Sequence, residues 1–461
     1  MVDTTMTDMN DMEETEIEVI TADDTTQEFD IGVEPQGARK KEIIHVVKTT
    51  SIEYQPSYDD DDDAMEDDDD DEKISAEDAD VRDDADMVFH KHSGPVYSIS
   101  VNPVDPRIVV TGGGDDVGVI WNREDGNVLY TLSGHQDTVV SVDFNFDGKY
   151  AATGGYDGLV KIWEVATGTL VANLEGPSQE VEWVCWHKKG NVVLAGSSDG
   201  TVWMWLATTG ECMHVFAGHE DGVTCGSFTG SGKMIVTGSS DMTVRVWNPK
   251  TGECNHGTST SLIAFRIGGR TNKTYVNSHG FHEGPVTFIA CHPSQPLVIS
   301  GSQDGTARLM QVQTKRILAA FSHEGIDPSV AGTVNDNSSA TENSVECGGF
   351  CNTMNWAATG CLGGYLRIWD LATNQCRHVC RHPAGVIKLL WHPAQPIVYS
   401  CTVEGLVYVW DARTGQLLKT LAGHTDMVLD MTFIPAFDGV PVAGLLTASD
   451  DESVRLFRLE N

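Results

Sequence analysis

The sequence has few basic residues, no long apolar run and no CxxC cysteine pair. Its 461 residues include 30 Lys and Arg against 68 Asp and Glu, and the formal net charge is −38. No uninterrupted apolar stretch approaches the roughly 20 residues that a membrane helix needs, so we expect no membrane span. The 11 cysteines are odd in number and scattered, and no apolar segment follows Met1, which argues against a secreted, disulfide-linked protein. We therefore expect reduced thiols and a cytoplasmic location, and the sequence leaves a nuclear location open.

The negative charge is concentrated in the first 86 residues, which hold 32 Asp and Glu against 6 Lys and Arg. This segment contains the acidic runs Asp59–Asp63 and Asp67–Glu72 and only three aromatic residues. Such a composition cannot bury enough apolar surface to offset the entropy of ordering, so we predict a disordered acidic tail over residues 1–85. Because no basic stripe compensates this charge, the composition predicts basic proteins as partners and no direct contact with nucleic acid.

A repeat of about 42 residues dominates the rest of the chain. A short segment in which apolar residues alternate, as in a half-buried strand, recurs every 42 residues and ends in a tryptophan. These tryptophans are Trp121, Trp163, Trp205 and Trp247. The equivalent later positions are Met310, Trp369, Trp410 and Phe457. The repeat therefore has eight units.

Each unit carries further side chains at fixed distances from its tryptophan position. Six residues earlier lies an acidic residue, four before that a Ser or Thr, and in most units a His lies 22 or 23 residues before the acidic residue. In the second and fourth units these side chains are His135, Thr153, Asp157, Trp163, His219, Thr237, Asp241 and Trp247. They can satisfy one another's buried polar groups, so we interpret them as structural hydrogen-bonded tetrads. The same residue types match a hydrolase triad, but their repetition at a structural spacing argues against catalysis.

This pattern of His, Ser or Thr, Asp and Trp resembles the WD40 family, and Trp369-Asp370 and Trp410-Asp411 supply the dipeptide that gives the family its name. The resemblance implies an all-β fold, an eight-bladed WD40 β-propeller, which we place at residues 86–461. We predict that residues 86–90 complete the eighth blade, because the last unit ends too soon after its Phe457 to supply its own outer strand.

Two units depart from the pattern. In the third unit Pro177 stands in the His place and Ala195 in the hydroxyl place. In the sixth unit we assign Thr341 to the His place and Gly363 to the Asp place. Such departures are places where function can have displaced a structural residue, although neutral decay explains them equally well.

Two intervals between units are long. We predict that the extra residues between Gly252 and Gly280 emerge on the face opposite the His and Asp turns. The polar stretch from Gly325 to Asn343 is predicted on the same face as those turns.

The sequence indicates no cofactor, metal or catalytic site. Cys376, His378, Cys380 and His382 alternate and could share one side of a strand. Simple occupancy of a strand explains this alternation better than a metal site, since tetrahedral sites need converging loops.

The mouth of the predicted ring is the candidate binding site. The inner strand of each blade lines the channel of a propeller, so residues near its start and beside the turn acid point into the mouth. These positions hold carboxylates and some aromatic or apolar side chains, which can hold a Lys- and Arg-rich peptide by charge-assisted hydrogen bonds and cation–π contacts. A solvated acidic loop surface is the alternative. The predicted partner-binding residues are Tyr97, Asp116, Asp137, Tyr156, Glu180, Glu182, Glu220, Asp221, Glu283, Glu346, Asp426 and Asp450.

The acidic tail, the eight units and the two insertions together are similar to the angio-associated migratory cell protein family, whose fungal relative is a dedicated chaperone for a newly made large-subunit ribosomal protein. The resemblance implies a monomeric, non-enzymatic chaperone or escort that binds a basic segment, the N-terminal region of such a ribosomal protein, in ribosome assembly. Two alternatives stay open: a signalling scaffold in cell migration and angiogenesis-type processes, and a substrate receptor of a ubiquitin ligase.

Overall fold

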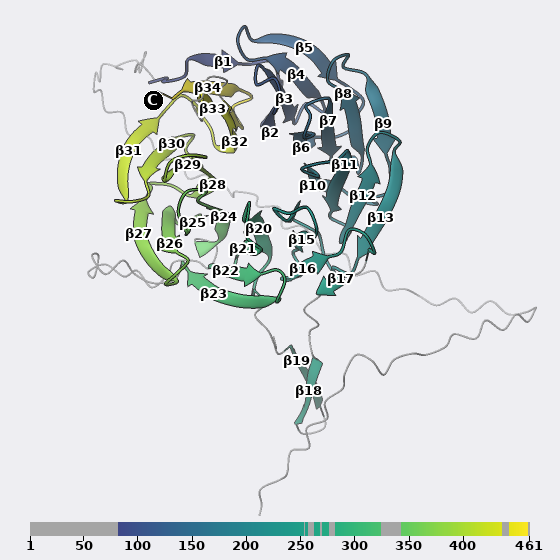
Figure 1. The fold of residues 1–461 in the computed structure, drawn as a ribbon, viewed down its shortest axis with the longest axis vertical. Coiled ribbons are helices and arrows are strands. Elements are labelled where there is room, and N and C mark those ends of the chain that lie inside the picture. Colours follow the sequence, from purple (N-terminus) through teal and green to yellow (C-terminus); the bar gives the residue numbers. More distant parts are fainter. Residues whose placement is uncertain are drawn as a thin grey trace, which may run out of the picture. The chain divides into compact units, whose positions relative to one another are not determined.

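The computed structural model describes residues 82–252, 254–256, 262–267, 270–275, 282–323, 343–435 and 442–459. Residues 1–81, which make up most of the predicted acidic tail, lie outside the described residues. The described strands form eight four-stranded antiparallel sheets and one separate two-stranded sheet. The sheets follow one another around a central opening, which confirms the predicted eight-bladed propeller (Figure 1).

The first four blades are regular meanders in chain order. Blade one contains β2 (Val96–Val101), β3 (Ile108–Gly113), β4 (Gly118–Asn122) and β5 (Asn127–Leu132). Blade two contains β6 (Val139–Phe144), β7 (Tyr150–Gly155), β8 (Val160–Glu164) and β9 (Leu170–Leu174). Blade three contains β10 (Val181–Trp186), β11 (Val192–Ser197), β12 (Thr201–Leu206) and β13 (Glu211–Ala217). Blade four contains β14 (Cys225–Phe228), β15 (Ile235–Gly238), β16 (Val244–Trp247) and β17 (Cys254–His256).

The second half of the ring repeats this order until the last blade. Blade five contains β20 (Val286–Cys291), β21 (Leu297–Ser302), β22 (Thr306–Gln311) and β23 (Arg316–Ser322). Blade six contains β24 (Val345–Phe350), β25 (Trp356–Cys361), β26 (Tyr365–Asp370) and β27 (Gln375–Arg381). Blade seven contains β28 (Val386–Trp391), β29 (Ile397–Thr402), β30 (Val407–Asp411) and β31 (Gln416–Leu421). Blade eight contains β32 (Val428–Ile434), β33 (Gly444–Ser449), β34 (Val454–Arg458) and β1 (Met87–Phe89).

The hydrophobic core consists of layers between neighbouring blades. In one layer Val110 and Ile120 of blade one pack with Val142 and Trp163 of blade two. The second strand of a blade is therefore covered on both faces, and the residues of β3, β7 and β11 are almost all buried. The outer strand has one face open to solvent, as the mostly exposed pattern of β9 shows.

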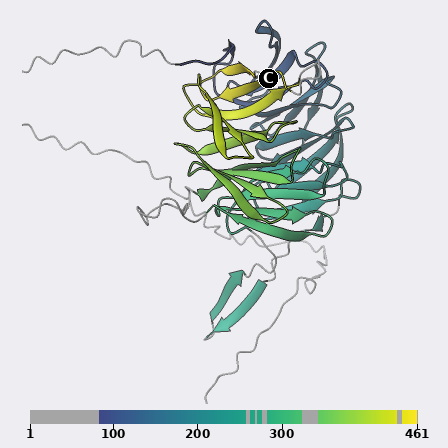
Figure 2. The same cartoon turned by 60° about the vertical axis from the view of Figure 1, so that its left-hand side comes forward.

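The ring closes with strands from both ends of the chain, as predicted. β1 pairs antiparallel with β34, so that Met87 lies opposite Leu456 and Phe89 opposite Val454. The view of Figure 2 shows the last strands of the ring beside its first ones. The Phe89 ring is buried and stacks on Trp121 of blade one, with 4.0 Å between ring centroids. One short strand thus joins the last blade to the first.

Contacts with the ring begin a few residues before the predicted boundary at residue 86. The backbone N–H of Asp84 donates to the carbonyl of Ala422, and the N–H of Ala422 donates to the Asp84 carboxylate, each over 2.9 Å. Asp83 forms an ion pair with Arg455 at 3.3 Å. Residues 82–86 are therefore fastened to the outer edges of blades seven and eight.

The predicted position of the first insertion is wrong. We expected the extra residues after Gly252 to lengthen the turn between the third and fourth strands, on the face opposite the His and Asp turns. Instead β17 starts almost directly after that turn and pairs with β16, Cys254 opposite Trp247. The extra residues therefore come after Cys254–His256, and not in the turn between the third and fourth strands of blade four. They include β18 (Leu262–Ile267) and β19 (Arg270–Tyr275), which form the separate two-stranded sheet.

The second insertion, residues 325–343, lies almost entirely outside the described residues. In the part of the chain that the structure covers, no helix is long and apolar enough to cross a membrane.

Candidate functional site

The predicted tetrads of blades two and four are hydrogen-bonded networks. In blade two His135 contacts Asp157 through Nδ1 at 3.0 Å and Thr153 through Nε2 at 2.8 Å, and the Trp163 indole donates to the same Thr153 hydroxyl at 2.9 Å. His219, Asp241, Thr237 and Trp247 repeat this arrangement, with contacts of 2.8, 2.8 and 2.9 Å. The Thr153 side chain is 0% exposed. Its hydroxyl is therefore out of reach of a substrate, and the network ties the connection that carries His135 to the strands of blade two.

The turn carboxylate of blade four, Asp241, is held in its charged form. Burial alone would raise the pKa of Asp241, but hydrogen bonds from His219 and Thr243 lower it well below its usual range. Burial in turn lowers the pKa of His219, so that the imidazole stays neutral. Asp241 thus places a negative charge at the edge of the mouth.

The third blade replaces the missing His with a serine. Both the N–H and the hydroxyl of Ser178, next to Pro177, donate to Asp199, over 2.8 and 2.9 Å. Ala195 is fully buried and offers no hydroxyl. Blade three thus keeps its turn carboxylate, Asp199, although it lacks the His and the hydroxyl of the tetrad.

In the sixth blade, the assignment of Thr341 to the His place is wrong. His323 fills that place, because its Nε2 contacts Thr359 at 2.7 Å, and Thr359 accepts from the Trp369 indole at 2.8 Å. The insertion separates His323 from the rest of its unit, so the usual spacing of 22 residues missed it. With Gly363 in the Asp place, His323 Nδ1 is buried without a hydrogen-bond partner among the described residues. Burial, with Arg367 nearby, lowers the pKa of His323 to about 3.

Five of the predicted mouth residues form one cluster over blades one to three. Burial raises the pKa of Tyr156, and the charges or dipoles of Glu182, Tyr97, Glu180 and Asp137 raise it further. The other four therefore lie near Tyr156, whose backbone N–H also donates to the carbonyl of Thr138, next to Asp137, at 3.0 Å. Glu182 also accepts a hydrogen bond of 2.5 Å from Ser198. We call these five residues the tyrosine–carboxylate cluster.

A second pair of predicted residues lies at blade eight. Burial raises the pKa of Asp450, and the nearby carboxylates of Asp426 and Asp451 add to this shift. Asp426 is exposed and Asp450 half-buried. Repulsion between these carboxylates favours a cation beside them.

The other predicted residues are on the same side of the ring, and no hydrogen bond or ion pair within the described part of the chain joins them to one another. They lie in the turns between second and third strands or in the connections between blades, which share one end of the sheets in an antiparallel meander. These residues are Asp116, Glu220, Asp221 and Glu283. Glu346 lies on the inner strand β24, in the wall of a cavity among the inner strands. Its carboxylate accepts a hydrogen bond from the Ser344 hydroxyl at 2.5 Å.

The channel contains a cation that the sequence analysis did not include. A cavity of about 320 Å³ lies among the inner strands of blades three to seven, with Trp183, Glu346 and Lys388 in its wall. Lys388 forms an ion pair with Asp430 at 2.9 Å, and this carboxylate raises the pKa of Lys388. Asp430 also accepts from the N–H of Ile99 in blade one at 3.0 Å. Asp430 therefore links blades seven, eight and one from the inside of the ring.

A further carboxylate, Asp143, lies on the inner strand β6. Ser100 donates to it over 3.2 Å and the N–H of Trp186 over 3.4 Å. Burial raises the pKa of Asp143 to about 6. Asp143 therefore holds a proton more readily than an exposed carboxylate does.

No cluster of three or more His, Cys, Asp or Glu side chains suited to a metal ion occurs within the described ranges.

Known proteins share both this sequence pattern and this fold. The family model for the WD domain, G-beta repeat, matches residues 86–122, 126–164, 168–205, 210–248, 273–309, 374–411 and 415–458. Human angio-associated migratory cell protein is 34% identical over 377 residues, which cover 81% of this chain and 80% of the human protein. The chain belongs to the WD40 family of angio-associated migratory cell protein. The segments that match the WD40 model leave out residues 310–373, which contain most of the sixth blade with its Gly363.

Solved structures of the same fold include two fungal WD40 propellers. The crystal structure of Saccharomyces cerevisiae Sqt1 matches with a TM-score of 0.70 at 22% identity, covering 82% of this chain and 100% of the yeast chain. Chaetomium thermophilum Sqt1 bound to the N-terminus of ribosomal protein L10 matches with a TM-score of 0.67 at 21% identity, covering 82% and 100%. At this level of identity the likeness concerns the fold.

Proposed function

We propose that this WD40 propeller is a non-enzymatic scaffold that holds a basic segment, the N-terminal region of a large-subunit ribosomal protein, as its chaperone or escort in ribosome assembly. The tyrosine–carboxylate cluster is the observation that carries this proposal. It combines three carboxylates with two phenol rings around Tyr156. Such a group binds guanidinium and ammonium ions by charge-assisted hydrogen bonds and cation–π contacts.

The wider charge distribution of the mouth supports the same ligand. In blades one, three, four, five and eight the pKa of the turn carboxylate at the entrance is lowered, and Asp426 and Asp450 add a second acidic point on blade eight. An extended peptide with several Lys or Arg residues can contact both points along the mouth. Complementary charge also raises the rate of encounter, and this effect falls as salt increases.

The solved relatives support the choice of client. Sqt1 from Chaetomium thermophilum, which shares this fold, was crystallised with the N-terminus of ribosomal protein L10. Basic, unfolded extensions bind stray RNA or aggregate when they are free, and an acidic mouth shields them until RNA of the particle competes for them. We include in this proposal a monomeric chain that acts in the cytoplasm.

A capture experiment tests the choice of client. We expect the tagged full chain, recovered from a salt-washed lysate of its own organism, to retain one large-subunit ribosomal protein in preference to others. Absence of every ribosomal protein from the recovered material contradicts the proposal. Receptor or GTPase-pathway proteins in their place support the signalling scaffold instead, which the name of the human relative favours.

A further inference from the structure

The mouth of the ring has a second side, on which the side chains are apolar. In each blade the residue before the position of the turn acid is held by one hydrogen bond, in which its N–H donates to a carbonyl just before the inner strand. In blade two this residue is Tyr156, in blade six Leu362 and in blade seven Val403, and each of the three bonds is 3.0 Å long. Leu362 and Val403 therefore occupy the place in their blades that the central tyrosine of the tyrosine–carboxylate cluster has in blade two.

Leu362 and Val403 lie on either side of Gly385. A side chain at Gly385 would come within 3.2 Å of the Leu362 Cα atom, and the Gly385 carbonyl accepts from the Val403 N–H. A side chain at Gly364 would come within 3.0 Å of the carbonyl of Ala384, the residue before Gly385. The Leu362 and Val403 side chains are 38% and 36% exposed. Backbone contacts thus bring two exposed apolar residues of neighbouring blades together at the mouth.

This part of the mouth lies across the opening from the tyrosine–carboxylate cluster. In a closed ring of eight blades, blades six and seven stand opposite blades two and three, as Figure 1 shows for β25 and β29 against β7 and β11. Glu182 is the second residue of the inner strand of blade three, and Ile387 is the second residue of the inner strand of blade seven. Glu180, which precedes the strand in blade three, corresponds to Gly385. Two positions that carry carboxylates in blade three thus carry an isoleucine and a glycine in the blade opposite.

We give the name apolar side of the mouth to Leu362, Ala384, Ile387 and Val403. Two carboxylates accompany it. Glu346 accepts a hydrogen bond from Ser344, and Glu404 is exposed in the same turn as Val403. A segment that lies on the apolar side can therefore still be positively charged as a whole, but it gains contact there through an apolar side chain.

We propose that the apolar side of the mouth selects the client by holding an aromatic or large aliphatic side chain of the same segment whose Lys and Arg residues bind the tyrosine–carboxylate cluster. This inference rests on the proposed function. An extended segment that fills the mouth lies against both of its sides, so its composition has to suit both. Attraction between charges at long range acts on any basic segment, whereas an apolar contact forms only where the segment carries an apolar side chain. The apolar contact therefore distinguishes one basic client from the others.

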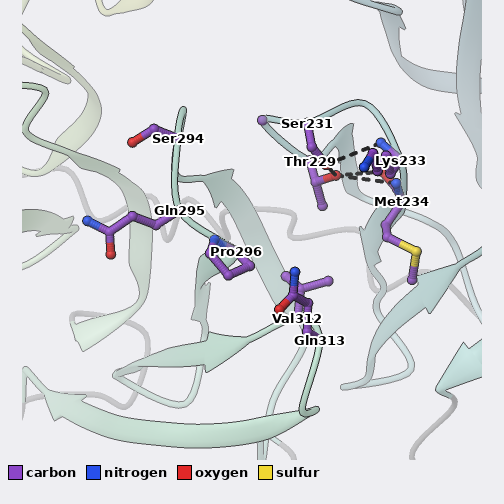
Figure 3. Close-up of a pocket in the computed structure, with 10 residues that line it drawn as sticks. Thr229, Ser231, Lys233, Met234, Ser294, Gln295, Pro296, Val312 and Gln313 are labelled. Carbon is purple, nitrogen blue, oxygen red and sulfur yellow. Dashed lines mark hydrogen bonds between the residues drawn. The ribbon is translucent and has the colours of Figure 1, made fainter.

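The apolar pocket on the other face of the ring is out of reach of such a segment. This pocket of about 280 Å³ lies between residues 229–234 of blade four and residues 294–296 of blade five, with Val312 beside them (Figure 3). These residues follow the first or third strand of their blades, whereas Leu362 follows a second strand, so they lie at the other end of the antiparallel sheets. A six-residue strand separates the two ends by about 20 Å. The apolar side chain of a client in the mouth therefore contacts the apolar side of the mouth.

The inference is tested by calorimetric titration of the full chain with two peptides. One has the N-terminal residues of ribosomal protein L10 from the same organism. In the other, the serine peptide, every Phe, Tyr, Trp, Leu, Ile, Met and Val is replaced by Ser and every Lys and Arg is kept. We expect the serine peptide to bind the wild type about tenfold more weakly, because burial of one large apolar side chain is worth about that factor. The salt dependence of the two affinities should be equal, because the charges are equal.

A double substitution locates the contact. Leu362→Ser with Val403→Ser should weaken the natural peptide about tenfold and should change the affinity of the serine peptide by less than about twofold. The control is Val104→Ser with Met354→Ser, which replaces two exposed apolar residues in turns of the opposite face. This control should bind both peptides like the wild type. If the Leu362 and Val403 variant binds the natural peptide as the wild type does, or loses affinity for both peptides equally, the apolar side of the mouth does not hold the client.

Failure of this inference and failure of the proposed function give different results. Equal affinity of the two peptides for the wild type, or a natural segment without any aromatic or large aliphatic side chain, overturns the inference and leaves the basic client in place. Absence of binding by both peptides contradicts the proposed function, and this inference with it. The comparison of two peptides on the wild type needs no substitution, so it decides the matter even if a variant does not fold.

Discussion

Replacement of Phe89 by Ala should destabilise the whole ring, because this residue joins the two ends of the propeller. Phe89 is 2% exposed and stacks on Trp121 at 4.0 Å with an interplanar angle of 10°. Truncation of a buried Phe to Ala removes about 3–5 kcal/mol, which includes the cavity left behind. Loss of the stacked pair adds about 1 kcal/mol. We expect the free energy of unfolding to fall by about 4–6 kcal/mol, measured by denaturant unfolding of the full chain followed by tryptophan fluorescence.

The neighbouring Val88 supplies the control. Its side chain is 45% exposed, although its backbone belongs to the same short strand. Val88→Ala should therefore change stability by no more than about 0.5 kcal/mol. The Phe89 variant should also associate through the loosened edge of β34, which light scattering detects. If the two variants unfold at the same denaturant concentration, closure by β1 does not hold the ring together.

Three further predictions concern the tetrads. Gly363→Asp should stabilise the chain by about 1–2 kcal/mol, because the new carboxylate gives His323 Nδ1 an acceptor; a lower melting temperature contradicts this. Asp241→Ala should cost about 3 kcal/mol in denaturant unfolding, because it leaves the buried His219 and two backbone N–H groups without their acceptor; a cost below about 1 kcal/mol argues against a structural role. Burial lowers the pKa of His382 to about 4. Since the unfolded state takes up the proton more readily, this residue should remove about 2 kcal/mol of stability between pH 7 and pH 5, and His382→Gln should abolish that part of the pH dependence.

The features that recur with the repeat could be predicted from the sequence. Eight units at fixed spacing predict eight blades, and the early end of the last unit predicts closure by the segment around Phe89. The spacing also identifies the tetrad side chains and places Tyr97, Tyr156 and Glu182 at the mouth. Their gathering around one phenol depends on how the turns fold over the inner strands, which spacing does not determine.

The features that interrupt the repeat could not be predicted in the same way. His323 was missed because the insertion separates it from its unit, although it directly follows an outer strand just as His135 does. The outer strand β17 was missed because only three of its residues remain before the first insertion. Lys388 is not among the predicted mouth residues because it lies one residue further along the inner strand β28 than the position that the repeat assigns to the mouth.

The most direct test of the central claim is a calorimetric titration of the full chain with a peptide of the N-terminal residues of ribosomal protein L10 from the same organism. We expect the wild type to bind, and a variant with Glu180→Gln and Glu182→Gln to bind at least tenfold more weakly, a loss of about 1.4 kcal/mol or more. A control with Glu124→Gln and Glu211→Gln, which removes two exposed carboxylates away from the mouth, should bind like the wild type. Equal affinity of both variants, or no binding by the wild type, contradicts the assignment of the mouth as the site for a basic client.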